Sequence, residues 1–262
     1  MTFPFKLGRN RPLARGPQLK ARRYFGEVIP SQPENADYTA PAKDYLSEIL
    51  GNDQLSNCTS AAAFHIDGTM LANAGKQIPY NLDQVINFYS LSTGYVRSDS
   101  STDQGGDEIT VLNCWQQHGL LGNGTATIAG WVALDGGNQL EVKACINGFE
   151  NCLFGVFLPD DWINNFPRAN GFVWDVVGPA SQNNGHAFPG LGYTPQGVII
   201  DTWGYLGIVT WAAVQAYASG GQGELYGTVS RDALNSANLL PSGINGAQMV
   251  GDFNSFFGAS VS

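Results

Sequence analysis

The chain has 262 residues, a formal net charge of −9 and 43% hydrophobic residues. This apolar content supports a sizeable core and excludes disordered and fibrous classes. No apolar run reaches the roughly 18 residues that would cross a bilayer, and the first 25 residues lack the apolar stretch of a signal peptide. Four cysteines, Cys58, Cys114, Cys145 and Cys152, are too few for the disulfide framework of a secreted domain. We therefore expect a soluble protein of the reducing cytoplasm, with free thiols and no membrane association.

Charge is distributed unevenly along the chain. Seven basic residues precede the first acidic one, Glu27, namely Lys6, Arg9, Arg11, Arg15, Lys20, Arg22 and Arg23. The remaining six basic residues face all 22 acidic ones, so the rest of the chain carries −16. This acidic body argues against nucleic-acid binding by the main domain, because phosphate contacts need Lys and Arg. Residues 1–26 are also rich in Pro and Gly, which predicts an extended arm that docks on an acidic protein partner or on the chain's own body. A solvated tail and a propeptide remain alternatives.

The first strong helix signal begins at Cys58. Asn57, Cys58 and Thr59 precede the alanine run of residues 61–63, and such residues favour a helix start at or next to the cysteine. A thiol at a helix N-terminus has a lowered pKa, because the positive end of the helix dipole stabilises the thiolate. Cys58 is therefore a candidate nucleophile, although a small buried core residue is the alternative.

A nucleophilic cysteine needs a base, and three histidines are available. His65 lies seven residues further along the same helix, about 10 Å up its axis, and cannot reach the thiol. His118 closes a helical pattern just before Gly119, where a ring can cap carbonyl groups. His186 follows a Gly- and Asn-rich loop and opens an apolar segment that reads as the start of a strand. The sequence thus favours His186 as the base.

Metal binding is not indicated. Cys114 and His118 lie four residues apart on one predicted helix face, which forms half of a zinc site at most, and no second Cys/His pair at ligand spacing accompanies them. We expect no metal and no cofactor.

Three short motifs resemble the papain-like cysteine peptidases. Residues 52–59 (NDQLSNCT) resemble the loop and helix start that carry the nucleophile, residues 185–193 (GHAFPGLGY) resemble the strand that carries the histidine, and residues 199–204 (IIDTWG) resemble the Asn-Ser-Trp-Gly signature that follows. Gly105 and Gly106 resemble the glycine pair on which substrate backbone lies. The resemblance covers roughly residues 45–230 and also extends to uncharacterised bacterial and phage-encoded members.

The resemblance implies a division of catalytic work. Cys58 would attack a carbonyl carbon, and His186 would take the thiol proton and pass it to the leaving group. Asp201 stands where the family usually has asparagine and would orient the imidazole, and Trp203 would shield that hydrogen bond from water. The substrate would be a peptide or protein.

The oxyanion hole departs from the family pattern. Papain-like sites use the backbone N–H of the nucleophile and a Gln side chain six positions before it. Here Asn52 occupies that position, and Gln54 lies only four positions before Cys58. Either side chain could donate, and a displaced donor would cost about two orders of magnitude in rate.

Helical patterns come first along the chain and strand patterns later, an α+β order that agrees with the papain-like two-lobe fold, in which a helical lobe and an antiparallel β-rich lobe enclose the active cleft. We predict an N-terminal arm and linker over residues 1–44, a papain-like domain over 45–230 with lobes of about 45–122 and 123–230, and a C-terminal extension over 231–262. Helices are expected near 58–74, 81–93, 107–118 and 137–148 and after Thr210, and strands near 125–134, 152–158, 171–177, 186–193, 197–202 and 223–230.

Three functions agree with these observations. The first is a cysteine peptidase or related thiol hydrolase that cleaves peptide or isopeptide bonds. The second is a structural or partner-binding protein that keeps the fold, such as a phage virion component anchored by its basic arm, in which case the protein would be virion-associated. The third is a thiol-dependent acyltransferase or amidase, because the same residues serve any acyl acceptor.

Overall fold

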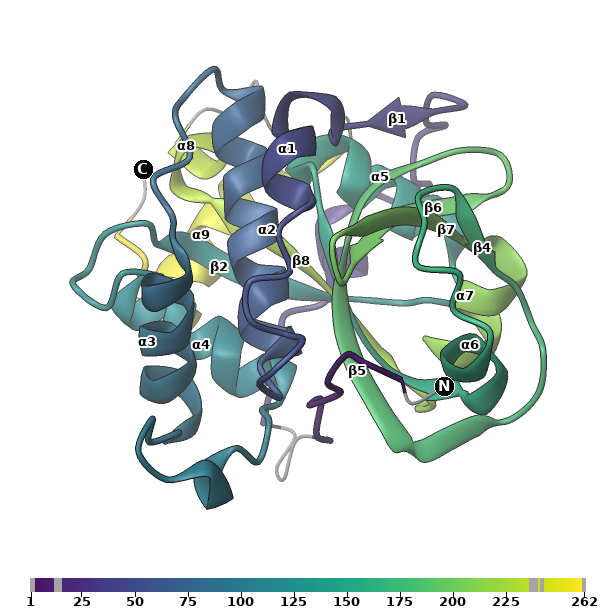
Figure 1. Ribbon diagram of the computed structural model, residues 1–262. Helices are drawn as coiled ribbons and strands as arrows, with labels where there is room; N and C mark the ends of the chain where they lie inside the picture. The colour runs from purple at the N-terminus through teal and green to yellow at the C-terminus, as the bar shows by residue number, and fades with distance from the viewer. Residues whose placement is uncertain (1–2, 12–15, 236–239, 241–242, 261–262) are drawn as a thin grey trace.

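The computed structural model describes residues 3–11, 16–235, 240 and 243–260. Figure 1 shows α1 to α4 together in one half and β4 to β7, with α6 and α7, in the other, and α2 lies along the boundary. The helical half contains α1 (Lys43–Leu46), α2 (Cys58–Asn73), α3 (Leu82–Thr93) and α4 (Glu108–His118). The mixed α+β class is confirmed.

Helix boundaries follow local sequence signals. The predicted start at Cys58 is correct, since α2 spans Cys58–Asn73. Helix α3 is capped by Asn81, whose side chain and that of Gln84 each accept from the other's backbone N–H, and the left-handed Gly94 ends it. Asp107 caps α4 by accepting from the N–H of Thr110. Helix α2, which carries Cys58, has no side-chain cap at Asn57, and the capped helices α3 and α4 pack against it.

One eight-stranded sheet extends from the helical half into the other, in the order β2-β8-β3-β5-β6-β7-β4, with β1 paired to β5. All pairings are antiparallel except β4 with β7. The strands are β1 (Ala36–Asp37), β2 (Ile128–Leu134), β3 (Cys152–Pro159), β4 (Phe172–Trp174), β5 (Ala180–Tyr193), β6 (Gly197–Thr202), β7 (Tyr205–Thr210) and β8 (Glu224–Ser230).

The remaining helices and short turns surround this sheet. They are η1 (Ala21–Tyr24), η2 (Ala40–Ala42), η3 (Ser100–Thr102), α5 (Gln139–Phe149), α6 (Asp160–Asn164), α7 (Trp211–Tyr217), α8 (Arg231–Asn235) and α9 (Gly246–Phe257). Helices α1 and α6 and strand β7 were absent from the sequence prediction. Both helices are shorter than six residues. Strand β7 completes a hairpin whose two-residue turn carries no Asn-Gly or Gly-Gly signal.

Strand β5 begins earlier than predicted. His186 lies in its interior, opposite Val156 of β3, whereas the sequence suggested that the strand starts at the histidine. Residues 181–184 are polar and thus read as a loop, yet their backbone continues the strand. The histidine is consequently held by a sheet on which α2 packs directly.

Two apolar clusters make up the core. One joins α2, α3 and α4 to the sheet, and the other lies under α5, α7 and α9. Leu19 and Tyr24 of the N-terminal segment and Met249 and Phe253 of the C-terminal segment are buried in the second cluster. Both predicted extensions therefore contribute to the packing of the main body, and the boundaries at 44 and 230 remain predictions.

Candidate active site

Cys58 is the first residue of α2 and is only 1% exposed. The backbone of Ala187 on β5, of Thr59, and of Gly8 near the N-terminus lies close enough to the thiol to lower its pKa. Because Ala187 directly follows His186, the strand brings its histidine to the helix start. Cys58 and His186 line the same small cavity.

His186 is held by a residue that the sequence analysis did not single out. Its Nε2 lies 2.7 Å from the Thr202 hydroxyl at the end of β6. Its Nδ1 is buried and has no hydrogen-bond partner among the described residues. A neutral imidazole that donates from Nε2 leaves Nδ1 as an acceptor, so this nitrogen is available for the proton of the thiol.

The prediction that Asp201 orients His186 is wrong for this structure. The Asp201 carboxylate lies 2.7 Å from Nδ1 of His65, and both side chains are buried. His65 is seven residues from Cys58 on the same face of α2, too far for the thiol but close enough for β6. Burial raises the pKa of Asp201, and the His65 ring partly offsets that rise. Asp201 and Thr202, which are adjacent on β6, thus contact His65 and His186, respectively.

Trp203 sits at a strained turn beside the histidine. Trp203 and Gly204 both have positive φ, 52° and 80°, between the paired residues Thr202 and Tyr205. Gly accepts this conformation readily, whereas for a bulky side chain it is an outlier. The turn stacks the indole on the His186 ring, with centroids 4.2 Å apart and planes 17° apart. Trp203 therefore covers one face of the imidazole.

The two predicted oxyanion donors, Asn52 and Gln54, differ in burial and in their distance from the cavity that Cys58 lines. Asn52 is buried and lines the cavity with Cys58, and its side chain donates to the carbonyl of Leu55 at 3.0 Å. Gln54 is exposed, does not line the cavity, and donates to the neighbouring Asp53. The structure thus does not bring Gln54 to the thiol, because the turn after Gly51 directs it outward.

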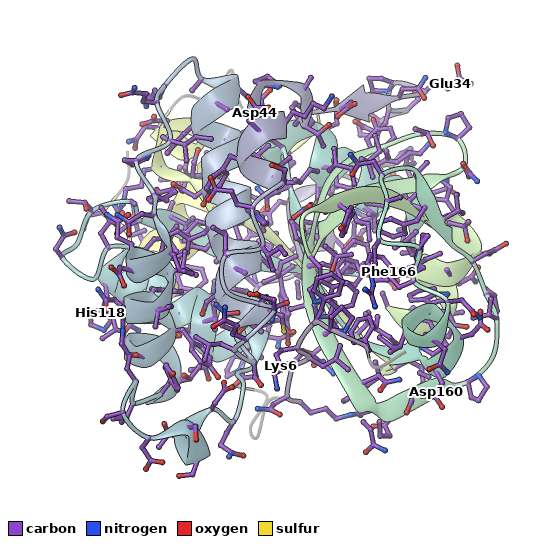
Figure 2. All side chains as sticks on the ribbon, in the orientation of Figure 1. Lys6, Glu34, Asp44, His118, Asp160 and Phe166 are labelled. Atoms are coloured by element: carbon purple, nitrogen blue, oxygen red, sulfur yellow. The ribbon has the colours of Figure 1, made fainter. Side chains whose placement is uncertain are left out.

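The N-terminal arm, defined here as residues 3–11, runs between the two halves. Figure 2 shows Lys6 at this boundary, whereas His118 lies on the outer side of the helical half. The N–H of Lys6 donates to the carbonyl of Asn52 at 2.8 Å, and its carbonyl accepts from the indole of Trp203 at 3.3 Å. Phe5 stacks on the other side of Trp203. The arm thus covers the histidine's aromatic neighbour.

Gly8 and Arg9 form the arm's closest approach to the site. The N–H of Gly106 donates to the carbonyl of Gly8, and the carbonyl of Gly185 accepts from the N–H groups of Gly8 and Arg9. An ideal Cβ on Gly105 would lie 2.0 Å from the Gly8 carbonyl oxygen. Gly105 and Gly106 therefore do receive an extended backbone, which here is the chain's own.

Burial keeps both candidate groups uncharged. It raises the pKa of the Cys58 thiol to about 12, although the nearby backbone of Ala187, Thr59 and Gly8 lowers it, and it lowers the pKa of His186 to about 3. The lowered thiol pKa expected from the helix start is therefore outweighed by desolvation. This arrangement is a neutral thiol beside a neutral imidazole, with the arm over both.

The other cysteines do not form a second site. Cys58, Cys114, Cys145 and Cys152 are all free and buried. Among the described residues, no group of three or more His, Cys, Asp or Glu side chains is placed to hold a metal ion. Within the same residues, no helix is long and apolar enough to cross a membrane.

Comparisons with solved structures identify the architecture. Xylellain, a cysteine protease from Xylella fastidiosa, superimposes with a TM-score of 0.62 at 13% identity, covering 87% of this chain and 97% of that one. The chain has the papain-like fold. Digestive procathepsin L 3 from Tenebrio molitor larval midgut matches with a TM-score of 0.54 at 12% identity, covering 82% and 76%. The ragweed pollen allergen Amb a 11, a cysteine protease in its proform, matches with a TM-score of 0.52 at 13% identity, covering 78% and 67%.

Sequence comparisons add nothing further: no family model matches, and no curated protein matches. Within the papain-like fold, the residue that sequence reasoning missed is Thr202. The strand pattern indicates that only one of Asp201 and Thr202 can face a given side of β6, but it does not indicate which of the two faces His186.

Proposed function

We propose that this protein is a cysteine peptidase that hydrolyses peptide or isopeptide bonds, with Cys58 as nucleophile and His186 as base. The observation that supports this most is the state of the His186 ring. Thr202 holds one ring nitrogen, and the other is buried without a partner in the cavity that Cys58 also lines. An unpartnered buried acceptor is unfavourable in a purely structural histidine, whereas a base requires one.

The reaction follows from these positions. His186 Nδ1 takes the thiol proton as the Cys58 sulfur attacks the carbonyl carbon of the substrate. The backbone N–H of Cys58, which has no intrahelical partner at the first position of α2, can donate to the oxyanion. Asn52 is the candidate second donor, once its side chain leaves the Leu55 carbonyl. The imidazolium then protonates the leaving amine, and water hydrolyses the thioester by the same base.

We further propose that the described structure is a resting state blocked by the arm. The Gly8 backbone lies close enough to the Cys58 thiol to affect its pKa. Its N–H donates to the Gly185 carbonyl, and its carbonyl oxygen accepts from the N–H of Gly106. Both polar groups of Gly8 are thus bound to the main body, so the arm is held in the place of a substrate strand.

A second candidate is a binding protein that keeps the fold and does no catalysis. It is favoured by the same arm, which fills the site, and by the engagement of Asp201 with His65 instead of His186. On this hypothesis the free ring nitrogen of His186 has no task, and the thiol stays unreactive when the arm leaves. The phage virion setting belongs to this candidate.

Peptide hydrolysis by full-length variants whose arm is bound less firmly distinguishes the peptidase from the binding protein. An ideal Cβ on Gly8 would lie 2.0 Å from the Ser56 carbonyl oxygen, so Gly8→Ala should displace the arm. Gly26→Ala is the matched control, because nothing lies within 4 Å of that Cβ. Peptidase activity should rise at least tenfold with Gly8→Ala, stay near wild type with Gly26→Ala, and vanish with Gly8→Ala/Cys58→Ala. Gly8→Ala protein that folds, exposes its arm to added protease and still cleaves no peptide would support the binding protein.

A further inference from the structure

Arg9 of the arm has a buried side chain in the middle of the molecule, only 1% exposed. Its Nε lies 3.3 Å from both carboxylate oxygens of Glu108, and its Nη2 lies 3.4 Å from Glu224. The guanidinium also lies over the Phe157 ring, 4.7 Å from its centroid. This enclosure by two carboxylates and an aromatic face distinguishes Arg9 from an ordinary surface arginine.

The two carboxylates belong to the main body and come from both halves. Glu108 is the first residue of α4, where a negative charge is favoured by the helix dipole. Glu224 is the first residue of β8, opposite Gly155 on β3, and its carboxylate also accepts from the hydroxyl of Tyr226. We call this set, Glu108, Glu224, Phe157 and Gly155, the acidic site.

The acidic site adjoins the candidate nucleophile. Gly155 pairs with Ala187, whose backbone lies close enough to the Cys58 thiol to lower its pKa. An ideal Cβ on Gly155 would lie 2.2 Å from Glu108 Oε1, so only glycine leaves room for this carboxylate. The backbone of Arg9 itself spans Gly106 and Gly185, the same groups on which a substrate strand would lie.

Substrate entry changes the charge balance of this site. When a substrate strand replaces the arm, Arg9 leaves, and Glu108 and Glu224 lose the guanidinium that contacts both. Burying uncompensated charge is costly, and burial already raises the pKa of Glu108 to about 7 with Arg9 in place. A substrate that brings its own guanidinium restores the ion pairs that the arm provided.

We infer that the acidic site is the specificity pocket of the proposed peptidase, and that it selects substrates carrying an arginine side chain at one fixed position before the cleaved bond. The inference rests on the proposed peptidase function, and the choice of arginine follows from the contacts of Arg9. Arginine fits better than lysine because its planar fork reaches two carboxylates and stacks on Phe157 at once. Acidic and aliphatic side chains are disfavoured there, since they bring no positive charge to the two carboxylates.

Binding measurements test the pocket without requiring catalysis. The protein is the full chain with Gly8→Ala, Arg9→Met and Cys58→Ala, and the probe is a fluorescein-labelled peptide with the sequence of residues 3–11. A second probe carries citrulline, the neutral isostere, at the arginine that corresponds to Arg9, and fluorescence anisotropy gives both affinities. We expect the citrulline peptide to bind about 10- to 100-fold more weakly. Equal affinities would overturn the inference.

Replacement of Glu108 and Glu224 tests whether the preference for arginine over citrulline arises at the acidic site. Glu108→Gln and Glu224→Gln, each added to the same chain and checked by thermal melting, should reduce the preference for arginine over citrulline at least fivefold. If one variant does not fold, the other still decides. A preference that survives both replacements would place the arginine elsewhere and overturn the assignment.

Cleavage of a peptide library distinguishes the two proposals. Full-length Gly8→Ala protein is incubated with peptides from a digested bacterial lysate, and the cleaved bonds are read by mass spectrometry. Enrichment of arginine at one fixed position before the cleaved bond, lost with Glu224→Gln, is expected. Cleavage with no such enrichment overturns the specificity while the peptidase stands. Absence of cleavage together with arginine-selective binding overturns the peptidase and leaves the acidic site as an arginine-binding pocket.

Discussion

The His186 ring is held by the hydroxyl of Thr202, 2.7 Å from its Nε2, and not by the adjacent carboxylate of Asp201. A hydroxyl fixes the orientation of a ring but does not carry the negative charge that would stabilise an imidazolium. The site therefore relies on positioning, on the stacked Trp203 and on exclusion of water more than on a charged partner.

Thr202→Val should lower kcat of the arm-weakened Gly8→Ala chain by about 10- to 100-fold, because the ring loses the bond that orients its free nitrogen. Thr202→Ser keeps the hydroxyl and should recover most of the rate. Steady-state kinetics with one peptide substrate, and the pH profile of kcat/KM, measure both effects. Equal rates for the serine and valine variants would argue against a positioning role for this hydroxyl.

Removal of the His65 ring should destabilise the protein strongly. His65→Leu leaves the Asp201 carboxylate buried without its partner, so the free energy of unfolding should fall by about 3 kcal/mol. Asp201 is expected to respond by taking up a proton, since burial already raises its pKa. Urea unfolding at neutral and acidic pH measures this, and the loss should be smaller at acidic pH. Loss of the same size at both values would mean that Asp201 stays charged.

Alkylation of Cys58 should report the position of the arm. In the wild-type chain, burial raises the thiol pKa to about 12, so iodoacetamide should react slowly at neutral pH and faster only in strong base. Gly8→Ala should bring the reactive range down by at least two pH units. Gly16→Ala, in an open part of the same N-terminal segment, serves as the control. Mass spectrometry of the peptide that contains Cys58 provides the rates, and a Gly8→Ala profile identical to wild type would show that the arm does not shield the thiol.

Stability should depend on pH through Glu108. Its pKa is raised from 4.5 to about 7 in the folded chain, mainly by burial, so folding favours the protonated carboxyl. The stability gained in this way is fully present below the ordinary pKa and is lost as the pH rises through about 7. Glu108→Gln is neutral throughout. The wild-type advantage over the variant should therefore fall by about 3 kcal/mol on going from acidic to mildly alkaline conditions.

Chemical denaturation of both proteins across this range measures the difference, in which the contributions of the other carboxylates cancel. A constant difference would mean that Arg9 keeps Glu108 ionised at every pH. Arg9→Met should increase the pH dependence further, because the Arg9 cation lowers the pKa of Glu108.

The amino-acid sequence by itself determined the order of elements and the two ends of the site. Local signals act over a few residues, so the helix start at Cys58, the cap at Asn81 and the strand that carries His186 could all be read from neighbouring residues. The family motifs added the spacing that joins the cysteine helix to the histidine strand, and the papain-like fold agrees with that spacing.

Only the tertiary structure decided which side chain each histidine meets. Asp201 and Thr202 are adjacent in sequence and point to opposite faces of β6, and the packing of the two histidines places His65 beside one and His186 beside the other. The same limit applies to Arg9, whose charge was evident in the sequence while its partners, Glu108 and Glu224, lie 99 and 215 residues away. Contacts over such separations depend on how the halves pack, which local propensity does not encode.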